Sequence, residues 1–137
     1  MKLIFLILIT YSNIIFSNVV GEITHLKNIN PSRVLFVGNS YFYYNDSLHN
    51  HVRRMVEEQF PNKVDKLEFK SATIGGSKLS HHDIDHLIAH KNIGVSKPFE
   101  LVILQGGSSE PLTLESRMKF KEDAKNLTKK INDSGAD

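Results

Sequence analysis

The sequence contains no cysteine, and neither acidic nor basic residues predominate. The lack of cysteine excludes disulfide bonds and cysteine-ligated metal sites. Lys and Arg number 17 against 15 Asp and Glu, for a net charge of +2, and the two signs are interspersed, which argues against a nucleic-acid-binding surface. Internal repeats and low-complexity segments are also missing. The 137 residues are enough for one domain.

The first 17 residues have the pattern of a secretory signal peptide. Lys2 gives a basic start, Leu3 to Ile9 form an uninterrupted apolar run, and Ser17 is a small residue at a candidate cleavage point. The alternative is an uncleaved membrane anchor, but Tyr11 to Asn13 interrupt the apolar stretch before it reaches a membrane-spanning length. No later segment is apolar enough to cross a bilayer. We therefore expect a secreted or periplasmic protein with no stable membrane insertion after signal cleavage.

Residues 18–32 are polar and mixed, and we interpret them as a linker to a domain that occupies residues 33–137. Within that domain, three segments have the character of short strands: Val34 to Val37, Val64 to Phe69, and Leu101 to Leu104. The last of these is uniformly apolar, which is typical of a buried parallel strand.

Helices are predicted between the strands. Apolar residues fall on one face from Leu48 to Phe60, and Asn45 or Asp46 can cap this helix. Ser80 is expected to cap a short second helix, and Thr113 a last one. The alternation of strands and helices predicts an α/β fold, with three layers (α/β/α) around a parallel sheet. A further strand is expected after the last helix, so we expect the chain to be the front portion of a longer, here truncated, domain.

Each predicted strand ends in a loop of small polar residues. Gly38-Asn39-Ser40 follows the first strand, Ile74-Gly75-Gly76-Ser77 follows the second, and Gln105 to Pro111 follows the third. Because right-handed crossovers bring the carboxyl ends of parallel strands to one edge of the sheet, these loops are expected to meet there. A serine exposed at that edge, Ser40, is a candidate nucleophile; the alternative is an ordinary turn between strand and helix.

The three loops, in this order, resemble the first three sequence blocks of the SGNH/GDSL hydrolase superfamily, over residues 34–111. The resemblance implies a flavodoxin-like fold and a serine esterase that needs neither a cofactor nor a metal. Ser40 corresponds to the nucleophile. The backbone N–H groups of Ser40 and Gly76 correspond to the oxyanion hole, with Gly75 as the neighbouring alternative. Such donors are needed because negative charge develops on the ester carbonyl oxygen in the transition state. Apart from the resemblance, Gly75-Gly76 is interpreted as a flexible turn.

The third block departs from the family pattern. Where the family has an asparagine whose amide joins the oxyanion hole, this chain has Ser109, whose hydroxyl is shorter. Gln105, at the end of the strand, is either the alternative donor or a structural side chain. Asn39 and His82 are further expected neighbours of the substrate site.

The family's general base is also missing from its usual place. The resemblance implies an Asp-x-x-His near the end of the domain, in which the histidine deprotonates the serine and the aspartate orients the histidine. No histidine follows His90. Asp83 to His86 fits this pattern but lies before the third block, on a predicted helix, where a surface ion pair is the simpler interpretation. We therefore expect the base beyond residue 137.

Two further groups of side chains require an interpretation. His82, His86 and His90 lie one helical turn apart, as metal-binding histidines do, but no motif of known mechanism surrounds them and we expect no metal site. Tyr41 to Tyr44 are four consecutive aromatic residues, each expected to pack in the core, although one or two can line a pocket for an acyl group or a sugar.

The sequence thus predicts ester hydrolysis through an acyl-enzyme on Ser40. The expected partner is a small-molecule or glycan ester, with an O-acetylated carbohydrate as the candidate substrate. The alternative is a catalytically inactive protein that keeps the cleft as a binding site.

Overall fold

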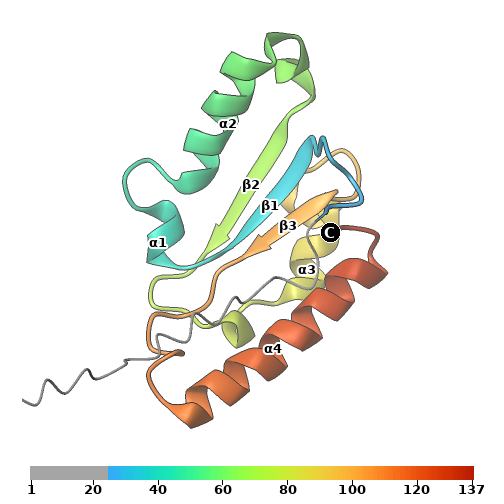
Figure 1. Cartoon of the computed structure of the whole chain (residues 1–137). Coiled ribbons are helices and arrows are strands. Elements are labelled where there is room, and N and C mark those ends of the chain that lie inside the picture. Colours follow the sequence, from blue (N-terminus) through green and yellow to red (C-terminus); the bar gives the residue numbers. More distant parts are fainter. Residues whose placement is uncertain (1–24) are drawn as a thin grey trace, which may run out of the picture.

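The computed structural model describes residues 25–137, so the signal peptide predicted at residues 1–17 lies outside the described residues. The domain is a mixed α/β structure built on three parallel strands, with helices on both faces of the sheet (Figure 1). In spatial order the strands are β2 (Glu68–Thr73), β1 (Arg33–Gly38) and β3 (Leu101–Leu104). The predictions of an α/β class and a parallel sheet are confirmed.

β1 is the central strand because its side chains are apolar on both faces. Alternate side chains of a strand point to opposite faces of the sheet. Val34 and Phe36 face one layer of helices, whereas Leu35 and Val37 face the other, and all four are buried. The strand pairs with β2 along six residues and with β3 along four. β1 therefore separates two hydrophobic cores.

The first core lies beneath α1 (Ser40–Tyr43) and α2 (Leu48–Gln59). The Phe36 ring is at its centre, with the rings of Phe42 and Phe69 at centroid distances of 5.9 and 6.3 Å. Tilted and edge-to-face arrangements of this kind are the ones that aromatic pairs prefer. The buried members of this core are Val34, Phe36, Phe42, Leu67 and Phe69.

The second core lies on the opposite face, beneath α3 (Ile84–Ile88) and α4 (Leu114–Asp133). Two short 3₁₀ helices, η2 (Leu79–His81) and η3 (His90–Ile93), flank α3. The predicted cap of α4 is confirmed, because the Thr113 side chain accepts a hydrogen bond from the Ser116 N–H at 3.1 Å. The buried members of this core are Leu35, Val37, Leu79, Ile84, Val95, Phe99, Val102, Leu127, Ile131 and Ala136.

The second strand begins later than predicted. Residues Pro61–Lys66 form a 3₁₀ helix, η1, and the strand starts at Glu68. The reason is Pro61, whose fixed φ suits the first position of a helical turn and whose missing N–H is not needed there. The strand prediction from Val64 was therefore wrong over its first four residues.

Two predicted helix caps are also wrong. The N-cap of α2 is Ser47, which makes no side-chain capping bond, and the Asp46 carboxylate pairs with the Arg54 guanidinium at 2.6 Å. Ser80 lies inside η2, and α3 is capped instead by Asp83, whose carboxylate accepts the His86 backbone N–H at 3.1 Å.

After α4 the chain returns to the outer edge of β3. The Asp137 N–H donates to the Glu100 carbonyl at 3.1 Å, and the Val102 N–H donates to the Asp137 carbonyl at 2.8 Å. This pair of bonds is the pattern that parallel strands make, so Asp137 lies alongside the start of β3. None of the helices in the described part of the chain has both the length and the apolar character needed to cross a membrane.

At the amino-terminal end of the sheet, one carboxylate joins β1 to the start of β3. One Glu100 oxygen accepts the N–H groups of Ser32 and Arg33 at 2.6 and 3.1 Å, and the other pairs with the Arg33 guanidinium at 2.5 Å. Burial by itself would raise the pKa of Glu100, but these N–H groups and the Arg33 charge outweigh it. The pKa therefore lies below its ordinary value of 4.5.

Glu100→Gln tests this contact, because glutamine keeps an acceptor oxygen but loses the charge. We expect the free energy of unfolding at pH 7 to fall by about 1–2 kcal/mol. A carboxyl whose pKa is lowered by folding stabilises the folded state above its unfolded pKa and loses that effect as the pH falls. The difference from wild type should therefore shrink below about pH 4.5 in urea titrations. Glu58→Gln, at an exposed position, is the control; a difference that stays constant from pH 7 to 3 would contradict the assignment.

Candidate functional site

The three loops predicted to meet at the carboxyl edge of the sheet do meet there. Ser40 is the first residue of α1, directly after β1. The Ile74 N–H, at the start of the second loop, donates to the Gly38 carbonyl at 3.1 Å. The Gln105 N–H, at the start of the third loop, donates to the Val37 carbonyl at 2.9 Å. Both neighbouring loops are thus fixed to the end of the strand that carries Ser40.

Asn39 links all three loops through a single buried side chain. It is 2% exposed, and its amide nitrogen donates to the carbonyls of Ser77 at 3.1 Å and Gly106 at 3.0 Å. Its amide oxygen caps α1 by accepting the Tyr41 N–H at 3.2 Å. With both amide hydrogens donated inside the protein, Asn39 positions the loops instead of contacting a substrate.

Gln105 completes this network from the third loop. Its side-chain oxygen accepts the Asn39 backbone N–H at 3.1 Å. Gly38 leaves the room for this contact, because a Cβ at that position would lie 2.7 Å from the Gln105 oxygen and 2.9 Å from the Phe42 ring. Of the two roles considered for Gln105, these contacts support the structural one.

Ser77 and His82 fix the second loop to the end of β1 through buried hydrogen bonds. The Ser77 hydroxyl donates to the Gly38 carbonyl at 3.1 Å, and Nε2 of His82 lies 2.9 Å from the same hydroxyl oxygen. Because the hydroxyl hydrogen goes to Gly38, we assign the Nε2–H tautomer to His82, with the ring as donor. His82, predicted as a neighbour of the substrate site, is 8% exposed and its ring is buried against Ser77. Burial lowers the pKa of His82 below its ordinary value of 6.5.

Ser40 is partly exposed, and backbone N–H groups at Ser40 and in the second loop are unused. Within residues 25–137, no acceptor is found for the N–H groups of Ser40, Gly75 or Gly76, and Gly75 and Gly76 are exposed. Gly76 has a φ of 69°, a left-handed conformation that favours glycine. The turn therefore exposes its backbone in a conformation that would strain a residue with a side chain. A nucleophile next to free N–H donors is the arrangement that acyl transfer uses.

The hydroxyl of Ser40 makes no hydrogen bond with any histidine in the part of the chain that the structure describes. The histidine ring contacts there go to Asn45, Arg54, Ser77, Lys78 and Asn92. Asp83 caps a helix with its carboxylate, so the expected ion pair between Asp83 and His86 is not formed. Residues 25–137 also contain no cluster of three or more metal-ligating side chains. Of the three histidines spaced one helical turn apart, His82 hydrogen-bonds to the Ser77 hydroxyl.

The third loop contains one polar contact that the sequence analysis missed. The Glu110 carboxylate is 3% exposed, and one of its oxygens accepts the Gly107 N–H. This bond shapes the turn after β3. The signal in the sequence was a single acidic residue in a loop of otherwise small residues. Ser109, the expected third oxyanion donor, lies exposed in this turn and accepts the Leu112 N–H through its carbonyl at 3.2 Å.

Of the four aromatic residues after Ser40, Phe42 alone packs in the core. Tyr41 and Tyr44 are 65% and 66% exposed, and Tyr43 is 39% exposed. The expectation of core packing is therefore wrong for the three tyrosines. A four-residue helix at the sheet edge turns only one of its sides to the sheet, and Phe42 occupies it.

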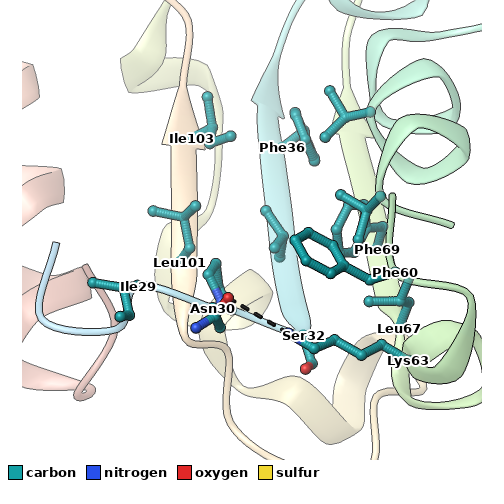
Figure 2. Close-up of a pocket in the computed structure, with 14 residues that line it drawn as sticks. Ile29, Asn30, Ser32, Phe36, Phe60, Lys63, Leu67, Phe69, Leu101 and Ile103 are labelled. Carbon is teal, nitrogen blue, oxygen red and sulfur yellow. Dashed lines mark hydrogen bonds between the residues drawn. The ribbon is translucent and has the colours of Figure 1, made fainter. Parts of the chain in front are cut away.

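An apolar pocket of about 190 Å³, partly open to solvent, lies away from these loops, between α2, the sheet and residues 29–32. Figure 2 shows Phe36, Leu101 and Ile103 along its wall, with a hydrogen bond between Lys63 and Asn30 at 3.5 Å. Because none of its lining residues belongs to the three loops, this cavity is not part of the Ser40 site.

Comparison of this chain with protein-family models, with curated proteins and with solved structures finds no match in any of the three. The site is therefore interpreted from its own geometry.

Asn39→Asp tests the role of Asn39 in joining the loops. Aspartate keeps the oxygen that caps α1 but puts a second oxygen against the carbonyls of Ser77 and Gly106. Losing two buried hydrogen bonds and burying a charge should lower the free energy of unfolding by at least about 3 kcal/mol in urea denaturation. Asn62→Asp, at an exposed position in η1, is the matched control and should stay within about 0.5 kcal/mol of wild type. Equal stability of the two variants would show that Asn39 does not hold the loops.

His82→Gln tests the buried histidine through its pH dependence. Because the pKa of His82 is lowered on folding, protonation favours the unfolded state. The wild-type free energy of unfolding should therefore fall as the pH drops below about 6.5, and the fall should be smaller in the variant. Urea titrations at pH 8, 6.5 and 5 measure this difference, with exposed His81→Gln as the control. If the free energy of unfolding depended on pH equally in wild type and His82→Gln, His82 would not be the source of this pH dependence.

Proposed function

We propose that this protein is a serine hydrolase of the SGNH type, with that superfamily's flavodoxin-like fold, and that it cleaves an ester through an acyl-enzyme on Ser40. The observation that supports this most directly is that the loop of Gly75 and Gly76 is fixed to the end of the strand before Ser40, and that the N–H groups of Ser40, Gly75 and Gly76 have no acceptor in residues 25–137. Such donors lower the barrier when they are held in place before the reaction. The bonds from Asn39 to Ser77 and Gly106 hold them here.

In the proposed reaction the Ser40 oxygen attacks the ester carbonyl carbon, and its proton passes to a general base. The tetrahedral oxyanion is stabilised by the N–H groups of Ser40 and Gly76. The carbon–oxygen bond to the alcohol then breaks, and the alcohol leaves with the proton. Water releases the acid by the same steps, regenerating the Ser40 hydroxyl.

The general base is the part of this proposal that the described residues do not supply. No histidine in residues 25–137 hydrogen-bonds to Ser40. The proposal therefore assigns this role to a group from outside those residues, and imidazole in solution can stand in for it in a test. The same observation favours the second candidate function, a binding protein that keeps the cleft without turnover.

For the substrate we propose an ester of a carbohydrate, an O-acetylated glycan in particular, reached by an exported protein. The support is the open edge around Ser40, where Tyr41 and Tyr44 expose their rings. Exposed tyrosines combine a flat apolar face with a polar group, and this combination binds a sugar ring better than it binds a lipid chain.

Ser40→Ala tests the nucleophile. Wild-type protein is treated with an alkyl fluorophosphonate, with and without added imidazole, and the adduct is mapped by mass spectrometry of peptides. We expect a phosphonyl adduct on the peptide that contains Ser40, none in Ser40→Ala, and unfolding free energies within about 0.5 kcal/mol of each other. Exposed Ser80→Ala is the control and should label like wild type. Folded wild-type protein that stays unlabelled even with imidazole would support the binding function.

A further inference from the structure

Tyr43 lies on the same side of α1 as Ser40. The two residues are the last and the first of this helix, and side chains three positions apart on a helix are neighbours. Tyr43 also reaches the second loop, because a Cβ built on Gly75 would lie 3.2 Å from the Tyr43 hydroxyl oxygen. The hydroxyl is therefore next to the loop that presents the N–H groups of Gly75 and Gly76.

The Tyr43 hydroxyl has no hydrogen-bond partner in residues 25–137. A phenol can donate one hydrogen bond, and Tyr43 is 39% exposed, less than Tyr41 or Tyr44. Its ring packs against the Tyr44 ring, with centroids 5.3 Å apart. The hydroxyl is thus a donor without a partner in residues 25–137, on a side chain whose ring packs against Tyr44 and whose oxygen lies next to Gly75.

The side chains that the sequence offered as a third oxyanion donor are those of Ser109 and Gln105. Ser109 lies exposed in the turn after β3, and the Gln105 oxygen is bound to the Asn39 N–H. The amide hydrogens of Asn39 are both donated to carbonyls of the protein. Because oxyanion stabilisation gains from each donor that is fixed in place, a further donor beside the Gly75-Gly76 loop would add to it.

We propose that the Tyr43 hydroxyl is this third donor, hydrogen-bonding to the substrate oxygen that becomes the oxyanion when Ser40 attacks. The inference rests on the proposed function and adds a residue to it. In this role Tyr43 donates a hydrogen bond and transfers no proton. It occupies the functional place that an asparagine amide has in the resemblance, but from the helix after the nucleophile and not from the third loop.

Tyr43→Phe removes the hydroxyl oxygen and leaves the ring in place. We expect phosphonylation of Ser40, measured as the rate of adduct formation with an alkyl fluorophosphonate plus imidazole, to slow about 10- to 100-fold. Exposed Ser80→Ala, which also removes one hydroxyl oxygen but lies outside the proposed site, is the control and should label within about twofold of wild type. Thermal unfolding midpoints should agree among wild type and the two variants, which separates loss of a donor from loss of structure.

Gly75→Ala provides a second, independent test. Its Cβ would press on the Tyr43 oxygen, so it should slow labelling in the wild-type background but have little further effect in Tyr43→Phe, where that oxygen is absent. Equal effects of Gly75→Ala in the two backgrounds would overturn the proposal. So would a Tyr43→Phe protein that labels at the wild-type rate while Ser40→Ala does not label; the Ser40 assignment would then stand alone. No labelling of Ser40 in folded wild type would remove both.

Discussion

The hydrogen bonds of one buried amide, Asn39, are the constraint on which the arrangement of the carboxyl edge depends. A parallel sheet brings the ends of its strands to one edge, but it does not fix the loops that follow them. Asn39 does so by donating to the second loop at Ser77 and to the third at Gly106. Because the next residue is Ser40, the contacts that fix the loops also fix the candidate nucleophile relative to them. Gly38 packs tightly against Gln105 and Phe42 because the first and third loops must approach each other for these hydrogen bonds to form.

Several parts of this arrangement could be predicted from the sequence. The apolar runs at Val34 and Leu101 led to the right strands, and Thr113 to the right helix cap. These features depend on neighbouring residues, which sequence patterns report directly. The start of β2 was wrong because Val64 has strand propensity, yet Pro61 begins a helical turn in the same segment.

The contacts within the site were harder to predict because they join residues far apart in the chain. The roles of Ser77, His82 and Glu110 depend on which carbonyl or N–H lies opposite each side chain, and no local pattern reports that. His82 was predicted as a neighbour of the substrate site, and the sequence did not reveal that its ring is buried against Ser77. Tyr43 was one of four aromatic residues expected in the core. Which of them is buried depends on the side of α1 that faces the sheet, and Phe42 lies on that side.

The two ends of the sheet are held by bonds of different kinds, and this gives them different responses to ionic strength. Arg33 and Glu100 join the amino-terminal end through charges that remain partly in contact with solvent, with side chains 21% and 23% exposed. The carboxyl edge is joined by neutral amides and carbonyls around Asn39. Dissolved salt screens the former and leaves the latter almost untouched. In concentrated salt the sheet should therefore loosen first at the end farthest from Ser40, while the geometry around Ser40 is kept.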